Sequence, residues 1–238
     1  MELIEKAERP VLYVGGGVIK AGAALELLQF AEAVNVPVVT TLMARGSFPD
    51  HHRLALGMPG MHGTYVATTA IQRSDLLVSL GARFDDRVTG DVDAFAPEAT
   101  VIHVDVDPAE IGKVRNAEVP IVGDARKVIA ALLDRLTSLR DPSDFPWRKE
   151  WFDQLEAWKS SHPLRYSQTE DGPIKTQHFI ERLHALTDGD AIVAAGVGQH
   201  QMWASQFWGF SEPGTWINSG GLGTVSYTHL TLPTIYSV

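Results

Sequence analysis

The chain has 238 residues, of which 45% are hydrophobic and 21% charged, and its formal net charge is −9. The apolar content excludes a disordered chain, the length excludes a mini-protein that needs covalent staples, and the absence of cysteine excludes disulfide scaffolds, thiolate chemistry and iron–sulfur clusters. The acidic balance argues against a nucleic-acid partner, and no apolar run is long enough to span a membrane. Because the first residues also lack the pattern of a signal peptide, we expect a soluble, cytoplasmic α/β protein.

Residues 10–136 alternate short β-branched segments with helical hydrophobic patterns. The predicted strands are Val11–Val14, Val36–Thr40, Leu76–Leu80, Thr100–Val104 and Val119–Val122. The predicted helices are Ala21–Val34, Thr64–Arg73, Ala109–Val114 and Ala125–Leu136. Strands that alternate with helices require crossover connections, which give a parallel sheet covered on both faces. The sequence therefore predicts a Rossmann-like parallel sheet of about six strands in this region.

The composition changes after this region. Residues 137–172 are rich in proline and charge and are predicted to form a linker, with one short amphipathic helix around Trp151, Leu155 and Trp158. A second α/β unit is then predicted from the helix Lys175–Leu186, the strand Ala191–Ala195, the helix His200–Phe207 and the strand Trp216–Ile217. Residues 226–238 contain no charged side chain and follow neither a helical nor a strand pattern.

A glycine run at residues 15–17 follows the first predicted strand and precedes a helix. Glycines at this place let the backbone approach a phosphate, although a turn that needs positive φ would explain them equally well. Lys20 occupies the third glycine position of the dinucleotide fingerprint, and no acidic residue that could bind a ribose lies between Ala33 and Pro49. An ordinary NAD site is therefore disfavoured.

Two further loops could bind an anion. The glycine-rich loop at residues 57–64 enters a helix and suits an anion or a flat ring, or it is a plain connection with His62 near the helix start. The segment at residues 81–87 follows the strand Leu76–Leu80, and its two arginines could clamp a phosphate or a carboxylate. A solvated cluster of salt bridges is the alternative for this segment.

Acidic residues and glycines follow the remaining strands. Asp105 is a ligand candidate at the end of its strand, whereas Asp107 and Pro108 fit an N-cap and the first position of a helix. Asp124 is either a ligand or a plain N-cap. In the second unit, the glycine turns at residues 196–200 and 219–224 could together hold a diphosphate.

Several consecutive motifs carry a resemblance to one family. They are YVGGGV, TTLMARGSFPDHH, LGMPGMHGTYVA, GARFDDRVTG, HVDVDPAEIGK, PIVGD, GQHQMWASQFW and SGGLGT. In this order and spacing, from Pro10 to Thr224, they resemble the large catalytic subunit of acetohydroxyacid synthase (acetolactate synthase), a thiamine-diphosphate enzyme. The resemblance implies decarboxylation of pyruvate on thiamine diphosphate and its joining to pyruvate or 2-ketobutyrate, in isoleucine and valine biosynthesis. It also implies the cofactors Mg²⁺ and a largely structural FAD, a homodimer or tetramer, and a regulatory small subunit.

The resemblance also implies a division of the chain and a set of cofactor contacts. Residues 1–136 would be the FAD-binding central domain, 137–172 a linker, 173–225 the start of the thiamine-diphosphate-binding domain, and 226–238 a tail foreign to the family. The FAD contacts carried over are Gly15, Gly16, Gly17, Thr41, Leu42, Met43, Gly60, Met61, His62, Gly81, Ala82, Arg83, Asp85, Arg87, Val88, Asp105, Val106, Glu110, Gly123 and Asp124. The thiamine-diphosphate contacts carried over are Val197, Gly198, Gln199, His200, Gly221, Leu222 and Gly223.

The sequence departs from the family pattern after Thr224. Val225 and the residues after it replace the expected motif beside the thiamine ring, and the acidic motif that holds Mg²⁺ is missing, as is the domain with the activating glutamate. We therefore expect no catalytic residue and no metal ligand in this chain, and no activity of the chain alone. The alternatives are another thiamine-diphosphate carboligase or decarboxylase, such as a glyoxylate carboligase, or a non-catalytic nucleotide-binding module.

Overall fold

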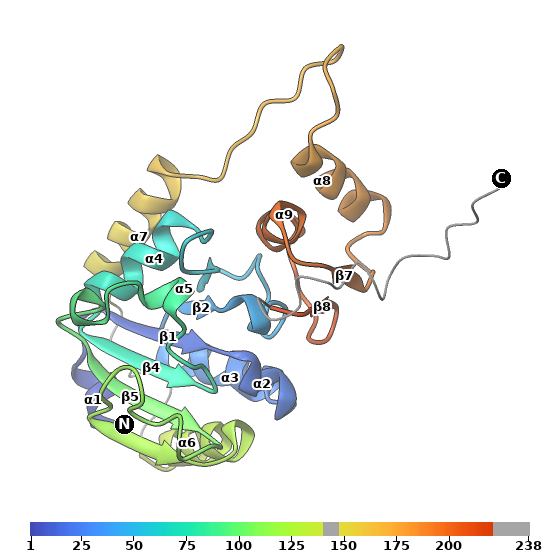
Figure 1. Ribbon diagram of the computed structural model, residues 1–238. Helices are drawn as coiled ribbons and strands as arrows, with labels where there is room; N and C mark the ends of the chain where they lie inside the picture. The colour runs from blue at the N-terminus through green and yellow to red at the C-terminus, as the bar shows by residue number, and fades with distance from the viewer. Residues whose placement is uncertain (140–147, 221–238) are drawn as a thin grey trace.

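A computed structural model describes residues 1–139 and 148–220. Its central feature is a six-stranded parallel sheet with the strand order β3-β2-β1-β4-β5-β6 (Figure 1). The strands are β1 Pro10–Val14, β2 Val38–Thr40, β3 Ala55–Gly57, β4 Leu76–Leu80, β5 Thr100–Asp105 and β6 Val119–Val122. The predicted parallel α/β sheet is confirmed.

Helices cover both faces of this sheet, as near-continuous apolar strands require. One face packs on α2 (Gly16–Lys20), α3 (Ala24–Val34) and α6 (Ala125–Leu139). The other face packs on α4 (Tyr65–Arg73) and α7 (Lys149–Ser161) (Figure 1). The short helix α1 (Glu2–Lys6) precedes β1, and α5 (Asp86–Thr89) follows β4. Two 3₁₀ turns complete this half, η1 (Leu42–Ala44) and η2 (Val92–Ala94).

One predicted helix does not form. Residues 109–112 form turns and residues 113–114 a bend, although Asp107 Oδ1 accepts a hydrogen bond from the Ala109 N–H at 2.9 Å, as a helix cap would. Gly112 adopts φ +73°, a left-handed conformation that a continuing helix cannot contain. The predicted helix Ala109–Val114 is therefore wrong, and this crossover from β5 to β6 is a turn-rich loop.

The helix predicted around Trp151 is α7, and it is part of the main core. Trp151 and Leu155 are buried in the same apolar cluster as α4, and the Trp151 indole donates to the Pro10 carbonyl of β1 at 3.3 Å. At its start, the Arg148 guanidinium donates to the carbonyls of Ile4, at 2.5 Å, and Ala7, at 2.7 Å. Part of the range 137–172 thus packs against the first unit.

The second unit contains α8 (Thr176–Leu186), β7 (Val193–Ala195), α9 (Gln199–Phe207) and β8 (Trp216–Asn218). Its two strands pair in parallel and form a sheet of their own. A separate apolar cluster contains Ile180, Trp208, Phe210 and Trp216. Within residues 1–139 and 148–220, every helix is too short or too polar to cross a membrane.

Candidate functional site

The sequence-predicted residues of the first unit gather at one edge of the large sheet. Parallel strands place all their carboxyl ends on the same edge, where open α/β sheets bind ligands. The turns after β1, β2, β4, β5 and β6 follow one another there along the sheet order. Backbone hydrogen bonds connect adjacent turns: Gly15 N–H to Leu80 O at 3.0 Å, Gly81 N–H to Val104 O at 2.8 Å, and Gly123 N–H to Asp105 O at 2.8 Å.

The glycine run after β1 is packed tightly against the turn after β4. A Cβ at Gly15 would lie 2.2 Å from the Gly81 carbonyl oxygen, and one at Gly17 would lie 2.7 Å from the Gly81 Cα. The Gly17 N–H donates to Gly81 O at 3.0 Å, so this amide is already used within the protein. These two glycines are thus required by the close approach of two backbone segments. The simpler sequence interpretation, a turn that needs positive φ, is wrong here, because neither glycine has a positive φ.

The segment after β4 presents its arginines outward. Ala82 and Phe84 are buried, whereas Arg83, Asp85 and Arg87 are exposed. The Asp85 carboxylate accepts from the Arg87 N–H at 3.0 Å and caps α5. Arg87 forms an exposed ion pair with the neighbouring Asp86 at 3.6 Å, while Arg83 forms no ion pair within the described ranges. Arg83 is therefore the cation of this segment that is available to an anion.

The glycine-rich loop after β3 is anchored to the same segment. The Gly60 N–H bonds Thr68 Oγ1 at 3.2 Å, and the Met61 N–H bonds the Arg87 carbonyl at 3.0 Å. Thr64 is the N-cap of α4, so His62 lies two residues before the cap, with its side chain exposed. Val88 packs close to Gly60, which brings this loop and the turn after β4 together.

The acidic residues after β5 and β6 have local partners. Asp105 Oδ1 accepts from the Asp107 N–H at 2.9 Å, and Glu110 pairs with Lys113 at 2.8 Å. Asp124 Oδ1 accepts from the Lys127 N–H at 3.1 Å in the first turn of α6. The N-cap interpretation of Asp124 therefore holds, and it leaves this carboxylate one further oxygen.

Apolar side chains are exposed along this edge, where solvent would normally favour polar residues. Met43 after β2, Met61 after β3, Val106 after β5 and Val122 at the end of β6 are 47%, 68%, 72% and 58% exposed. Together with the unpaired Arg83, they form a surface that fits a flat, partly apolar ligand carrying negative charge.

In the second unit, α9 begins directly after the turn that contains Val197 and Gly198. The side chains of Gln199 and His200 are exposed, and the His200 ring lies against Gly198. A helix start with exposed polar side chains behind a glycine suits a diphosphate. Gly221, Leu222 and Gly223, together with the tail 226–238, lie outside the described residues.

Gln201 is a site residue that the sequence analysis missed. It is fully buried, and its amide nitrogen donates to Asn218 Oδ1 and to the Gly220 carbonyl, both at 3.2 Å. Its Oε1 has no hydrogen-bond partner among the described residues. Gln201 thus ties the start of α9 to the second glycine turn, and a buried unpaired acceptor is the kind of atom that a ligand donor satisfies. The only sequence signal was a glutamine on the inner side of a helix.

The two glycine-rich regions meet at Met43. A Cβ at Gly16 would lie 3.2 Å from Met43 Cβ, and one at Gly220 would lie 3.4 Å from its Sδ. The Trp216 indole also donates to the Leu42 carbonyl at 2.9 Å. The carboxyl edge of the large sheet therefore lies beside the glycine turn of the second unit.

A buried ion pair holds the two units in this arrangement. The Arg45 guanidinium is paired with the Asp50 carboxylate, which also accepts from the Phe210 N–H at 2.8 Å. The Asp50 N–H in turn donates to the Phe210 carbonyl at 2.9 Å. Burial raises the pKa of Asp50 despite the neighbouring Arg45, so the pair lies in a poorly solvated environment.

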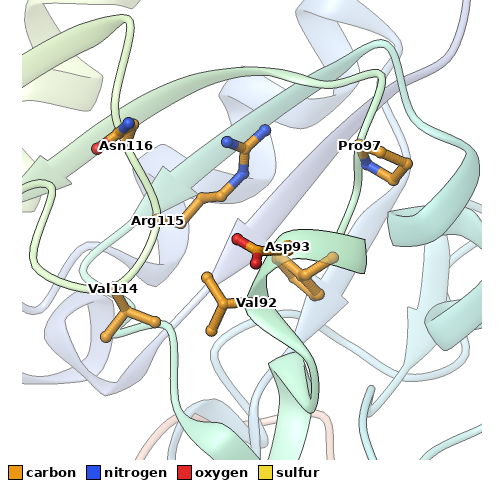
Figure 2. A pocket seen from close by; sticks show the side chains of 7 residues that line it. Val92, Asp93, Pro97, Val114, Arg115 and Asn116 are labelled. Carbon is orange, nitrogen blue, oxygen red and sulfur yellow. The ribbon is translucent and has the colours of Figure 1, made fainter.

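A cavity lies away from this edge of the sheet. It has a volume of about 240 Å³ and is formed by the connections that lead into β5 and β6 (Figure 2). Its arginine, Arg115, serves the fold by donating to the Ala96 and Ala99 carbonyls at 3.4 and 3.3 Å. The residues 1–139 and 148–220 contain no group of three or more histidine or acidic side chains able to hold a metal ion.

Comparison with protein families identifies the class to which this fold and site belong. The chain matches the thiamine pyrophosphate enzyme central domain over residues 1–132 and the C-terminal TPP binding domain of the same enzymes over residues 196–229. The chain belongs to the thiamine pyrophosphate enzyme family. This agrees with the resemblance drawn from its motifs.

Particular relatives narrow the comparison. The chain is 56% identical over 227 residues to the acetolactate synthase large subunit of Corynebacterium glutamicum. It is 54% identical over 226 residues to an acetolactate synthase of Mycobacterium bovis, and 45% identical over 227 residues to the acetolactate synthase isozyme 3 large subunit of Escherichia coli. Each match covers 95% of this chain, but the chain spans only 36%, 36% and 39% of these relatives.

Proposed function

We propose that this chain serves in an acetolactate synthase large subunit, where it binds FAD at the carboxyl edge of the large sheet and thiamine diphosphate at the start of α9. The observation that carries the proposal is the meeting of the two glycine-rich regions at Met43. Similarity to the relatives named acetolactate synthase extends across both regions and supports the same assignment.

The residues proposed for FAD divide into three groups by their role. The glycines at residues 15–17 and 81 bring the backbone of neighbouring turns close together and keep the edge flat. Arg83 would neutralise the diphosphate, and the exposed Met43, Met61 and Val106 would cover the ring surfaces. The other FAD contacts implied by the family motifs lie along the same edge and belong to the same proposal.

The residues proposed for thiamine diphosphate lie in the second unit. When bound, this cofactor supplies the carbon on which a 2-keto acid is decarboxylated and joined to a second one. The first N–H groups of α9 would bind the diphosphate, and His200 and Gln199 would contact it from the exposed side. Gln201 would hold the following glycine turn in place and offer its unpaired Oε1 to a donor.

We also propose the wider assignment that the motif resemblance implies, which similarity to relatives named acetolactate synthase supports. It comprises pyruvate and 2-ketobutyrate as substrates, Mg²⁺ as a further cofactor, a small regulatory subunit, a homodimer or tetramer, and a cytoplasmic location. The proposed divisions are a central domain over 1–136, a linker over 137–172, the start of the thiamine-diphosphate domain over 173–225, and a non-family tail over 226–238. No residue described here is assigned to Mg²⁺.

Calorimetric titration of the purified chain with FAD and with NAD tests the proposal. FAD should bind more tightly than NAD, because the region after β2 lacks the acidic residue that an NAD ribose needs. Arg83→Ala should weaken FAD binding about tenfold or more, since it removes a charged contact to the diphosphate. Arg73→Ala is the matched control, because Arg73 is an exposed arginine just before β4, at the opposite end of that strand.

Three results would contradict the assignment. The first is tighter binding of NAD than of FAD. The second is no FAD binding by a chain whose circular dichroism shows that it is folded. The third is an equal loss of affinity in Arg83→Ala and Arg73→Ala, which would show that the arginine at the carboxyl edge has no special role.

A further inference from the structure

A row of polar side chains crosses the interior of the large sheet. Tyr13 of β1 is in register with Ser79 of β4, and Ser79 is in register with His103 of β5. All three side chains are fully buried. They lie on the face covered by α4 and α7, where their neighbours in the same strands are Val11, Leu77 and Val101.

The three polar groups of this row converge on one turn. The Ser79 hydroxyl and the His103 Nε2 each donate to the Ala82 carbonyl at 3.1 Å. The Tyr13 hydroxyl donates to the next carbonyl, that of Arg83, at 3.3 Å. Because the partner of His103 Nε2 is a carbonyl oxygen, which can only accept, His103 carries its proton on Nε2. Its buried Nδ1 has no partner among the described residues.

The row also supports the turn through its rings. Phe84 is buried and stacks on Tyr13, with 5.7 Å between ring centroids, and it meets the His103 ring edge-on at 5.1 Å. Ala82 and Phe84 thus face the row, while Arg83 between them faces the solvent. The direction in which Arg83 projects is therefore set by groups beneath the turn.

Burying three polar groups in an apolar core costs desolvation free energy, which each group recovers only by forming a hydrogen bond. Val39 occupies the next position of the same row on β2 and shows that an apolar residue fits there. The unpaired His103 Nδ1 shows that the row is not optimised for stability alone. Its hydrogen bonds are concentrated on two successive carbonyls of the turn that carries Arg83.

We propose that Tyr13, Ser79 and His103 are positioning residues that preorganise the turn at residues 82–84, so that Arg83 meets the diphosphate of a flavin dinucleotide without rearrangement. This inference rests on the proposed FAD site at the carboxyl edge. Preorganisation of a charged contact improves affinity because the turn loses little conformational freedom when the ligand binds.

The test compares serines at the two ends of β4. Ser79→Ala removes one donor to the Ala82 carbonyl, and Ser74→Ala removes a buried hydroxyl that donates to the Ile71 carbonyl at 2.7 Å just before the same strand. Both variants should lower thermal stability to a similar degree. Only Ser79→Ala should weaken FAD binding, by about three- to tenfold, which is the range expected for one lost hydrogen bond.

Tyr13→Phe and two His103 variants extend the comparison. Tyr13→Phe removes only the hydroxyl and should weaken FAD binding to a similar extent. His103→Leu removes the donor and should weaken it, whereas His103→Gln keeps an N–H donor near the Ala82 carbonyl and should recover part of the affinity. That recovery would distinguish positioning from general packing, because leucine fills the space as well as glutamine does.

A second readout does not depend on the ligand. Trypsin should cleave after Arg83 faster in Ser79→Ala than in Ser74→Ala. The rate is measured by mass spectrometry of the fragment that ends at Arg83. Equal cleavage rates in the two variants, or unchanged FAD affinity in Ser79→Ala, Tyr13→Phe and His103→Leu, would overturn the inference. A folded wild-type chain that binds no FAD would overturn the proposed function, and the cleavage rates would still decide whether the row holds the turn.

Discussion

The imidazole of His103 lies in β5, between β4 and β6, with no access to solvent. Burial lowers its pKa, and this effect outweighs the Ala82 carbonyl and the carboxylates of Asp105 and Glu110, which act in the opposite direction. The folded protein therefore binds a proton at His103 less readily than the unfolded chain does. The sign of the resulting pH dependence follows directly.

Acidification should destabilise the protein through His103. Above the pKa of about 6.5 that His103 has in the unfolded chain, the residue is neutral in both the folded and the unfolded state and does not affect the free energy of unfolding. As the pH falls from there toward the lowered folded pKa, the unfolded state binds the proton first and the free energy of unfolding decreases. Urea unfolding between pH 7.5 and 5 should show this decrease in the wild type and a shallower one in His103→Gln. Parallel pH profiles for the two proteins would contradict the prediction.

The roles of some residues could be predicted from the sequence, and the roles of others could not. Asp124 was predicted as either a cap or a ligand, and the cap is confirmed. Ser79 was hidden in a strand of otherwise apolar residues, because a serine in such a run gives no sign of which carbonyl it will reach. The roles of Gln201 and His103 depend on groups 17 or more positions away, so local patterns could not reveal them.

At the scale of elements, apolar runs predicted the strands well because parallel strands are buried on both faces. The strand β3 was not predicted, because it comprises only Ala55–Gly57 and is too short to give a strand pattern in the sequence. The helix Ala109–Val114 was wrong because helical spacing and a capping aspartate did not outweigh Gly112 in a left-handed conformation. Helix existence in the second unit was predicted correctly, and the boundaries moved by a residue or two.

Arg148 connects elements that are far apart in the sequence. Its guanidinium donates to the carbonyls of Ile4 and Ala7 at the end of α1, and of Val34 at the end of α3. Such terminal carbonyls have no partner within their own helix. One side chain at the start of α7 therefore closes two helix ends.

Replacing this residue should be costly. Arg148→Met should lower the free energy of unfolding by about 2–4 kcal/mol, because charge-assisted bonds are lost and buried carbonyls are left unpaired. Lys149→Met is the adjacent control, since Lys149 is exposed and forms an exposed ion pair with Asp153 four residues on. Chemical denaturation of both variants gives the measurement. A loss in Arg148→Met no larger than in Lys149→Met would show that the helix ends find other partners.

At the scale of the whole molecule, the two units are joined through the segment after β2. The Arg45 side chain is 4% exposed and that of its partner Asp50 is 16% exposed, so this ion pair is largely removed from water. Asp50 also forms two hydrogen bonds with the backbone of Phe210: its carboxylate accepts from the Phe210 N–H, and its own N–H donates to the Phe210 carbonyl. Removing one charge would leave the other buried without an opposite charge beside it.

Arg45→Met should lower the free energy of unfolding by about 3–5 kcal/mol at neutral pH. Because burial already raises the pKa of Asp50, loss of the arginine should raise it further, so the deficit should shrink as acid neutralises the carboxylate. In differential scanning calorimetry the two units should unfold in coincident transitions in the wild type and in separate transitions in the variant.

Two controls complete this experiment. Lys6→Met breaks an exposed pair with Glu2 and should leave both transitions coincident. The double variant Arg45→Met, Asp50→Leu should be more stable than Arg45→Met alone, because it no longer buries an unpaired charge. A deficit in Arg45→Met that stays constant down to pH 5 would refute the role given to Asp50.

The tight packing of Gly15 and Gly17 against Gly81 affects how the glycine run should be read in other chains. Any side chain placed there would displace the backbone of the neighbouring turn, so selection for folding alone preserves these glycines. A homologue that has lost its ligand would keep them, and an alanine scan would report misfolding as lost binding. The exposed apolar residues at the same edge, such as Met61 and Val106, do not pack into the core, so their replacement should report on ligand binding rather than on folding.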